Sequence, residues 1–371
     1  MNMLKLLRQT VSAVLTGVAL GAVLISPSTD ACTTLVLPAT DHTRIYARTM
    51  EFAMDTKSRL VGLPRNLPLT GQKGLVWKAK YAVTGMNVFN MPAMLDGMNE
   101  KGLTGGALYF PGLAGYTAPG EVGAGQGLAP WEFLTWALTN FSSVAEVRAA
   151  LPTIRIMSVT LKDMGIVPPL HYTLHDATGA SIVIEPVNGK LKVYDNPPGV
   201  MTNSPDFAWH LSNLRNYANL TPENVPTTSA DDVAGTPADV GYGLRGMPGD
   251  PTSASRFVRA VLLVRSAQKT AGGLPGVRMA EHIASSFTIP KGLIRDKGVP
   301  GDYTQWISVA DLGQKRYYIR TWDNPVLSGV GFSDFDINGP AMTWFVIPKE
   351  TQPQTLKSQD GGTQTLNISV K

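Results

Sequence analysis

Short runs of apolar and β-branched residues, with polar residues at alternate positions, occupy most of the first third of the chain. Residues 33–37 form one such run, and residues 44–50 alternate between two faces over the length of a strand. Asp41 and His42 supply a polar turn between them, so the pattern predicts a hairpin that returns its second strand beside residue 32. Further strands are predicted over residues 76–88, 94–110, 171–175, 181–185, 191–195, 303–311, 316–321 and 342–347, with a polar turn at 96–103 inside the second of these.

Helical spacing follows in the middle of the chain. Pro130 stands in a first turn, where proline is tolerated, and Ser143 with Glu146 has capping-box spacing before a helix over 144–151. Further helices are predicted over 206–217, 252–268 and 277–287. The Gly- and Pro-rich stretch 111–127 has no periodic pattern and is predicted to be a loop over a pocket. Because strands and helices occur in separate groups, the pattern favours an α+β fold with antiparallel sheets and helices packed outside them.

The two ends of the chain differ from its middle. Residues 1–31 have the layout of a signal peptide, with a positively charged start, an apolar run and the small Ala31 before the expected cut. The apolar run is shorter than the ~20 residues that a membrane span needs. An uncleaved anchor and a lipoprotein acylated on Cys32 are the alternatives. We therefore predict a periplasmic or secreted protein with no membrane span after processing, with a mature domain over 32–349 and a loose polar tail over 350–371.

The composition narrows the classes of function. The net charge is +4 and charged residues are 16% of the chain, with no run of like charge, so nucleic-acid binding has no electrostatic support. His171 and His175 would share one face of a strand, but two histidines without a third ligand are more often structural, so we predict no metal and no cofactor. Neither the G-x-S-x-G elbow of serine hydrolases nor the glycine spacing of dinucleotide-binding loops occurs.

Cys32 is the only cysteine of the chain, which excludes an internal disulfide and leaves one free thiol in a protein predicted to be exported. Cleavage after Ala31 would place this thiol and the new α-amine on one residue. The unperturbed pKa of an α-amine, ~7.7–8.0, lies below the ~8.5 of a thiol, so the neutral amine can accept the thiol proton directly or through a water. A neighbouring arginine would favour the thiolate. The alternative interpretation is that a lone cysteine is a small buried hydrophobe.

Seven short segments, in order along the chain, support a more specific interpretation. They are 32–34 (CTT), 46–52 (YARTMEF), 96–103 (DGMNEKGL), 201–205 (MTNSP), 247–250 (MPGD), 255–259 (SRFVR) and 303–306 (YTQW). With them the chain resembles the choloylglycine hydrolase and penicillin V acylase family of N-terminal nucleophile hydrolases. No single segment is specific, but together they span nearly the whole predicted mature chain.

The resemblance implies a four-layer αββα sandwich that hydrolyses a linear carbon–nitrogen amide bond. Within it, Cys32 resembles the nucleophile, its amine resembles the base, and Arg48 resembles the arginine beside the thiol. Glu51 stands where the family usually has an aspartate that holds the amine. Asn203 resembles the asparagine whose side chain helps to form the oxyanion hole.

Two further residues follow from the resemblance. Arg256 resembles the second arginine of the site, and Arg259, one turn along the same predicted helix, is the alternative. Tyr109 stands where the bile-salt enzymes usually carry asparagine and where a penicillin V acylase has tyrosine. Without the resemblance these residues have ordinary interpretations, since arginines form ion pairs, an asparagine before Ser-Pro makes turns, and strand tyrosines fill cores.

We therefore predict an exported, cofactor-free amidase that acts on a small-molecule amide and prefers an aromatic or alkyl acyl group, as a penicillin V acylase does. A conjugated bile salt hydrolase and an acyl-homoserine lactone acylase are the alternatives within the family. A non-catalytic periplasmic or lipid-anchored binding protein is the alternative from another class. The resemblance also implies a homo-oligomer, namely a tetramer.

Overall fold

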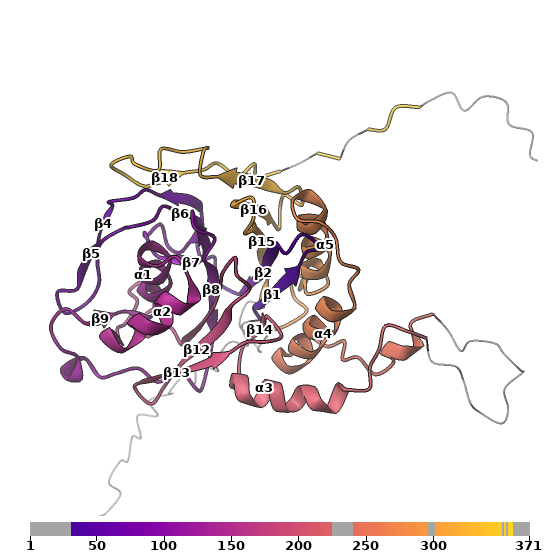
Figure 1. The fold of residues 1–371 in the computed structure, drawn as a ribbon, viewed down its shortest axis with the longest axis horizontal. Coiled ribbons are helices and arrows are strands. Elements are labelled where there is room, and N and C mark those ends of the chain that lie inside the picture. Colours follow the sequence, from indigo (N-terminus) through magenta and orange to yellow (C-terminus); the bar gives the residue numbers. More distant parts are fainter. Residues whose placement is uncertain (1–30, 225–239, 296–300, 351, 354, 359–371) are drawn as a thin grey trace, which may run out of the picture.

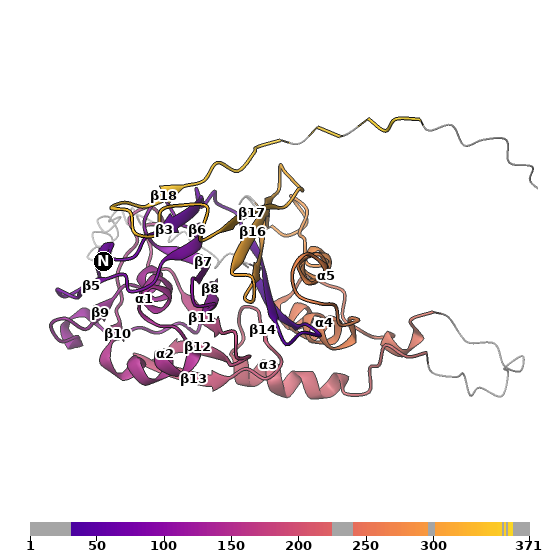
Figure 2. The same ribbon diagram turned by 45° about the horizontal axis from the view of Figure 1, so that its top comes forward.

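Two large antiparallel sheets face each other in the centre of the molecule, and helices cover the outer face of each (Figure 1). The computed structural model describes residues 31–224, 240–295, 301–350, 352–353 and 355–358. Helices α1 (Phe133–Asn140) and α2 (Val144–Ala150) cover the larger sheet, and α4 (Ser253–Ser266) and α5 (Leu274–Ser285) cover the smaller one. The two groups of helices stay on opposite sides in the turned view (Figure 2). The αββα sandwich expected from the sequence is therefore present.

The two sheets draw their strands from distant parts of the chain. The smaller sheet has the order β14-β1-β2-β15-β16-β17 and the larger has the order β13-β12-β11-β8-β7-β6-β3-β18. The smaller contains β1 (Thr33–Pro38), β2 (Arg44–Phe52), β14 (Val200–Met201), β15 (Tyr303–Asp311), β16 (Arg316–Thr321) and β17 (Ser328–Gly331). The larger contains β3 (Leu60–Leu63), β6 (Val83–Asn87), β7 (Met94–Asn99), β8 (Thr104–Tyr109), β11 (Leu170–His175), β12 (Ser181–Val187), β13 (Lys190–Asp195) and β18 (Thr343–Trp344). Two short ladders pair β4 (Pro68–Thr70) with β5 (Val76–Lys78), and β9 (Gly127–Leu128) with β10 (Arg155–Ile156).

Three of the described helices, α2, α3 and α4, begin after a polar residue whose side chain caps them. Ser143 accepts a hydrogen bond from the Glu146 N–H, and the Glu146 carboxylate accepts from the N–H of Ser142 rather than that of Ser143, so the predicted capping box is shifted by one residue. Asp206 caps α3 (Phe207–Leu214) and Thr252 caps α4 in the same manner. The 3-10 turns are Pro119–Glu121, Pro130–Glu132, Leu151–Thr153, Arg215–Tyr217 and Tyr242–Leu244.

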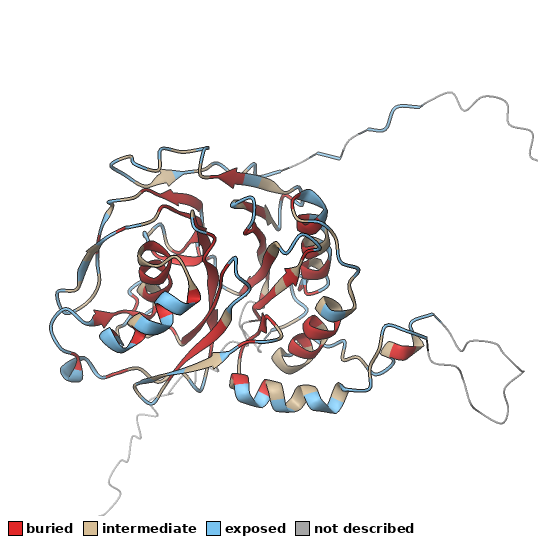
Figure 3. Ribbon diagram, in the orientation of Figure 1, coloured by how far each residue is buried: buried red, intermediate tan, exposed pale blue. Residues whose placement is uncertain are grey.

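The predicted hairpin is present and lies between the layers. The whole of β1 pairs with β2, and both faces of β2 are buried, which Figure 3 shows as red strands between the helical layers. Because side chains alternate along a strand, Ile45 packs against Gly276 of α5, while Tyr46 and Arg48 reach toward the larger sheet. One strand therefore carries both core residues and residues of the cavity between the sheets.

The prediction of a single strand over residues 76–88 was wrong. β5 and β6 belong to different sheets, because the N–H groups of Lys80 and Tyr81 between them both bond the carbonyl of Thr139 in α1. Of residues 342–347, only Thr343 and Trp344 form a strand. The sequence pattern also missed β3, β4, β9, β10, β14 and β17, which are too short to display an alternation.

The hairpin formed by β7 and β8 corrects another prediction. The predicted turn at 96–103 narrows to residues 100–103, so Asp96 and Gly97 lie inside β7. Gly105 and Gly106 lie inside β8. A Cβ atom on Gly105 would meet the carbonyl oxygen of Thr173 on the neighbouring strand at 2.2 Å, so close packing explains this glycine.

The predicted segments at the two ends fall mostly outside the described residues. Residues 1–30 and 359–371 are not described, and the described part of the predicted tail, from residue 350 to residue 358, is exposed. Within the part of the chain that the structure describes, no helix has the length and apolar character needed to cross a membrane.

Candidate active site

Cys32 lies at the beginning of β1, and two neighbouring strands place residues against it. The antiparallel register that pairs Thr34 with Met201 on β14 continues to set Asn203 opposite Cys32. On the other side, the register with β2 sets Met50 opposite Cys32, and the two sulfur atoms are 3.8 Å apart. The cysteine is 2% exposed and lines a cavity. The only thiol of the chain is thus a wall residue of a cavity.

Arg48 is fixed beside this thiol by the larger sheet. One terminal nitrogen, Nη1, donates to the Leu95 carbonyl, and Nη2 donates to the Ala107 carbonyl at 2.7 Å. Nη2 also lies 3.7 Å from Cys32 Sγ. The missing side chain of Gly106 leaves room for this guanidinium, since a Cβ there would lie 3.1 Å from Nη1. Burial raises the pKa of the Cys32 thiol above its ordinary value, and the positive charge of Arg48 opposes that rise.

Asn203 and Arg256 hold the backbone of Cys32 from the other side. Asn203 Oδ1 accepts hydrogen bonds from the Cys32 N–H at 2.9 Å and from Arg256 Nη2 at 2.7 Å. Asn203 Nδ2 donates to the carbonyl of Tyr109 at 2.8 Å and keeps its second hydrogen. Arg256 Nη1 donates to the Cys32 carbonyl and, at 2.8 Å, to Thr33 Oγ1. These contacts leave the position of the Cys32 backbone little freedom.

The structure separates the two candidate arginines of α4. Arg256 is buried and contacts Cys32, whereas Arg259 donates to the carbonyl of Pro248 at 2.9 Å and stacks over Phe287. Burial lowers the pKa of Arg256 to about 10, and the nearby charges of Glu51 and Cys32 oppose that change. Arg256 therefore belongs to the site and Arg259 does not.

Glu51 lies close to Cys32, but its carboxylate is held by two threonines. Thr49 Oγ1 donates to Glu51 Oε2 at 2.9 Å, and Thr304 Oγ1 donates to Oε1 at 2.7 Å. The Cys32 nitrogen, which here is a peptide nitrogen bonded to Ala31, donates to Asn203 instead. Burial raises the pKa of Glu51 to about 8 despite these donors. The contact between Glu51 and the amine that the resemblance implies stays a prediction for the processed chain.

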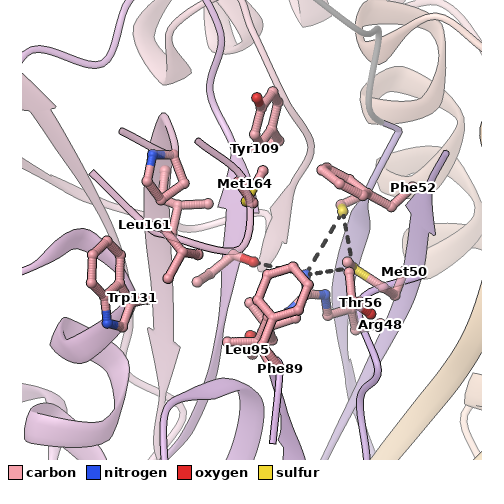
Figure 4. A pocket seen from close by; sticks show the side chains of 15 residues that line it. Arg48, Met50, Phe52, Thr56, Phe89, Leu95, Tyr109, Trp131, Leu161 and Met164 are labelled. Carbon is pink, nitrogen blue, oxygen red and sulfur yellow. Dashed lines mark hydrogen bonds between the residues drawn. The ribbon is translucent and has the colours of Figure 1, made fainter. Parts of the chain in front are cut away.

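The cavity in front of the thiol has apolar walls. Tyr109 lines it as expected and meets Phe52 edge to face, with the ring centroids 5.6 Å apart. Figure 4 shows the labelled side chains around this space, Arg48 among them. The remaining lining residues are Cys32, Met50, Thr56, Val88, Phe89, Leu95, Ala107, Trp131, Leu161, Met164, Pro168 and Leu170. An apolar group of a ligand is what such walls favour.

Residues 111–127 are largely a loop, as predicted, but the prediction that this loop covers the pocket was wrong. None of residues 111–127 lines this cavity, because the backbone of that stretch pairs elsewhere: Gly115 with Pro186 and Gly189, and Thr117 with Ile156 and Ser158. A segment later in the chain, residues 161–168, supplies part of the wall instead. The only sequence signal that residues 161–168 could line a cavity was the presence of apolar side chains in a turn-rich stretch.

The histidines have no metal-binding arrangement. His171 Nε2 bonds the Thr202 carbonyl at 2.9 Å, and His175 bonds Thr173 and Ser181 through its two ring nitrogens. Burial lowers the pKa of His175 to about 3, so its ring is neutral. Among the residues with described positions, no three His, Cys, Asp or Glu side chains are grouped to hold an ion.

Comparisons with known proteins agree with this geometry. The family model described as linear amide C–N hydrolases, choloylglycine hydrolase family, matches residues 32–345. A bile salt hydrolase/transferase of Clostridium perfringens is 34% identical over 313 residues, which are 83% of this chain and 94% of that protein. A solved mutant of the conjugated bile acid hydrolase from Clostridium perfringens has a TM-score of 0.79 at 32% identity and covers 88% of this chain and 100% of its own. A penicillin V acylase of Pectobacterium atrosepticum is 28% identical over 321 residues, 80% of this chain and 79% of that protein.

The chain therefore belongs to the choloylglycine hydrolase family, and it is a hydrolase of linear amide C–N bonds. The fold is that of the N-terminal nucleophile hydrolases. The resemblance drawn from seven short segments is confirmed. The alternative of a non-catalytic binding protein is wrong.

Proposed function

We propose that Cys32 is the nucleophile of an amidase that releases apolar acyl groups. One observation carries the proposal: the single thiol of the chain lines an apolar cavity, 3.7 Å from the guanidinium of Arg48. A positive charge beside a cysteine favours the thiolate, which is the reactive form. The apolar walls would take the acyl part of the substrate, and the amide carbonyl would then lie at the sulfur.

The reaction follows from the groups around the sulfur. The thiolate attacks the amide carbonyl carbon. The resulting oxyanion accepts two hydrogen bonds, one from the second N–H of Asn203 Nδ2 and one from a backbone N–H. The α-amine of Cys32 takes the thiol proton and returns it to the leaving nitrogen, so the C–N bond breaks and a thioester remains. Water, activated by the same amine, then releases the carboxylic acid and regenerates the thiol. Arg256 and Asn203 hold the Cys32 backbone throughout.

This mechanism requires a free α-amine, and the peptide bond to Ala31 removes it. An amide nitrogen has no basic lone pair, so the chain that retains residues 1–31 would lack its base. The family match begins at Cys32 and the residue before it is small, which supports cleavage between Ala31 and Cys32. We accordingly propose an exported enzyme, periplasmic or secreted, that becomes active on processing.

N-terminal sequencing of the secreted protein tests processing, and we expect Cys32 as the first residue with a free amine. Ala31→Phe should block the cut, because a signal peptidase needs a small residue there. The retained chain should then be inactive while its thiol still reacts with alkylating reagents. Any other first residue, or a diacylglycerol mass increment on Cys32, would contradict the mechanism.

Within this reaction class, we propose that the acyl group is aromatic or alkyl, as in penicillin V acylase. The support is Tyr109, whose ring faces Phe52 at the cavity wall, with Phe89 and Trp131 adding further aromatic surface. A phenoxyacetyl ring would stack on such faces, which contributes ~0.5–1.5 kcal/mol beyond its buried area. A long-chain acyl-homoserine lactone would fit the same apolar walls.

Hydrolysis of conjugated bile salts is the second candidate. The relative that favours it is the bile salt hydrolase/transferase, at 34% identity over most of both chains. A bile acid also presents a large apolar surface, so the cavity walls alone do not separate the two substrates. The panel of substrates therefore contains phenoxymethylpenicillin, glycocholate and an acyl-homoserine lactone.

As to assembly, we propose a homo-oligomer, specifically a tetramer, which sedimentation analysis would test.

A change at Tyr109 should alter the choice between these substrates. We expect wild-type kcat/KM to favour phenoxymethylpenicillin over glycocholate, and Tyr109→Asn to reduce that ratio about fivefold, since one lost ring contact is worth ~1 kcal/mol. Tyr109→Phe is the matched control, because it keeps the ring and should keep the ratio. A wild type that prefers glycocholate, or a ratio unmoved by Tyr109→Asn, would remove Tyr109 as a determinant of acyl preference.

A further inference from the structure

Asp96 is a buried carboxylate that the mechanism above does not use. It lies on β7, inside the segment DGMNEKGL, and its side chain is 0% exposed. The carboxylate crosses the space between the sheets and accepts three hydroxyl hydrogen bonds: from Tyr46 at 2.6 Å, Tyr317 at 2.6 Å and Ser308 at 2.8 Å. Burial raises the pKa of Asp96, and the charge of Arg48 together with these three hydroxyl donors opposes that rise by stabilising the ionised carboxylate.

Arg48 lies between this carboxylate and the thiol. Arg48 Nη1 is 3.8 Å from Asp96 Oδ2, while Nη2 of the same guanidinium is 3.7 Å from Cys32 Sγ. The ring of Trp306 lies under the guanidinium, 5.3 Å from its carbon. One buried cation is therefore shared by two acidic groups, the carboxylate and the thiol.

The orientation of Arg48 does not depend on Asp96 alone. The carbonyls of Leu95 and Ala107 each accept one of its terminal N–H groups. These bonds stay in place when the carboxylate is replaced by an amide of the same shape. The main quantity that such a replacement changes is charge, because one negative charge beside Arg48 disappears.

We propose that Asp96 is a positioning residue that acts through Arg48: it balances the arginine charge and so limits how strongly Arg48 favours the Cys32 thiolate. The inference rests on the proposed role of Cys32 and goes beyond it, since it assigns a function to a group that does not touch the thiol. A thiol that gives up its proton too readily is a weaker nucleophile, so a partly balanced arginine serves attack on an amide better than an unbalanced one.

The other titratable groups around Asp96 and Cys32 do not reverse the effect of the Asp96 charge on the thiol pKa. Arg48 and Glu51 of β2 and Arg256 of α4 act electrostatically on Cys32, and the α-amine joins them after processing. Around Asp96 the titratable groups are Tyr46, Tyr317 and Arg48, with His175 against the ring of Tyr46, 5.5 Å between centroids. Burial raises the pKa of Tyr46 well above its ordinary value and that of Tyr317 likewise, so both keep their protons at neutral pH. Among these titratable groups, Asp96→Asn therefore changes the charge of Asp96 alone. The amide also replaces one acceptor oxygen by an NH2 donor, so at least one of the three hydroxyls loses its bond to residue 96, and the control variant below measures the effect of such a loss.

The test is the pH dependence of alkylation of the single thiol in the processed enzyme, with iodoacetamide as the probe. We expect Asp96→Asn to move the midpoint of the alkylation rate to lower pH by about half a unit to one unit, because a negative charge near the thiol has been removed. The acid limb of kcat/KM should move in the same direction. Tyr317→Phe is the matched control: it deletes a hydrogen bond to Asp96 but keeps both charges, so its midpoint should shift much less than that of Asp96→Asn.

The outcomes separate this inference from its alternatives. Equal midpoints in wild type and Asp96→Asn, a midpoint that rises, or equal shifts in Asp96→Asn and Tyr317→Phe would overturn it and leave Asp96 as a link between the sheets. If Asp96→Asn does not fold, Asp96→Ser, which leaves space for a water, gives the same measurement, and failure of both to fold also counts against the inference. Wild-type enzyme that keeps its activity after alkylation would overturn the role of Cys32, while the thiol midpoints would still test Asp96.

Discussion

Replacement of Cys32 by alanine should abolish amide hydrolysis, with a loss of kcat on the order of 10⁴-fold or more, the scale seen when a covalent nucleophile is removed. The reason is that the sulfur forms the bond to the acyl carbon, and the cavity presents no second thiol, since the chain has none. The measurement is single-turnover and steady-state hydrolysis of phenoxymethylpenicillin and glycocholate. The same loss should follow one equivalent of iodoacetamide on the wild type.

Controls separate lost chemistry from lost structure. Cys32→Ala removes a side chain that is 2% exposed, so its thermal unfolding is compared with that of Cys32→Ser, which keeps nearly the same volume. Both variants should bind substrate with a Kd near the wild-type value, because the apolar walls are untouched. Full activity after stoichiometric alkylation would rule out Cys32 as nucleophile.

Asn203→Ala is the second large effect, and we expect kcat to fall by ~10²–10³, the usual loss for one oxyanion-hole donor. KM should change much less, because the negative charge on oxygen exists only in the transition state. The variant also leaves Arg256 Nη2 and the Tyr109 carbonyl without their bonds to Asn203, which should cost ~1–3 kcal/mol of stability.

Asn203→Asp makes a sharper comparison at the same position. An aspartate keeps an oxygen for Arg256 and for the Cys32 nitrogen, while its second oxygen would face the Tyr109 carbonyl, which now accepts from Asn203 Nδ2 at 2.8 Å. The aspartate has no N–H to offer the oxyanion and adds a like charge, so kcat should fall at least as far as in Asn203→Ala. Ser204→Ala, which removes only a bond to the Pro111 carbonyl, should leave kcat unchanged. If Asn203→Ala raised KM and left kcat unchanged, Asn203 would be a substrate-binding residue instead.

Several parts of the site follow from local rules that a sequence displays. Alternation along a strand and one polar turn are enough to predict the hairpin of β1 and β2, and that hairpin brings Arg48 beside Cys32. The same alternation explains Glu51: it is three positions from Arg48 and two from Thr49, so it shares the face of Thr49 and bonds that side chain. Seven short segments were enough to predict the family and the αββα layers.

Other parts depend on contacts between residues far apart in the chain, which no local pattern encodes. Arg256 and Arg259 differ by less than one helical turn, and only the packing of α4 against β1 decides that Arg256 meets Cys32. Residues 161–168 line the cavity, and the loop 111–127 does not, because the backbone of that loop forms hydrogen bonds with other segments.

The sequence by itself determined the layered fold, the single thiol, the arginine beside it and the family to which the chain belongs, because periodicity and short motifs act over a few residues. The tertiary structure alone decided which helix arginine holds the Cys32 backbone, which segment closes the cavity and why Asp96 is buried. The carboxylate of Asp96 is stabilised by hydrogen bonds from hydroxyls on β2, β15 and β16, from residues up to 221 positions away in the chain. Such long-range contacts form only when two sheets pack face to face, so a linear pattern cannot display them.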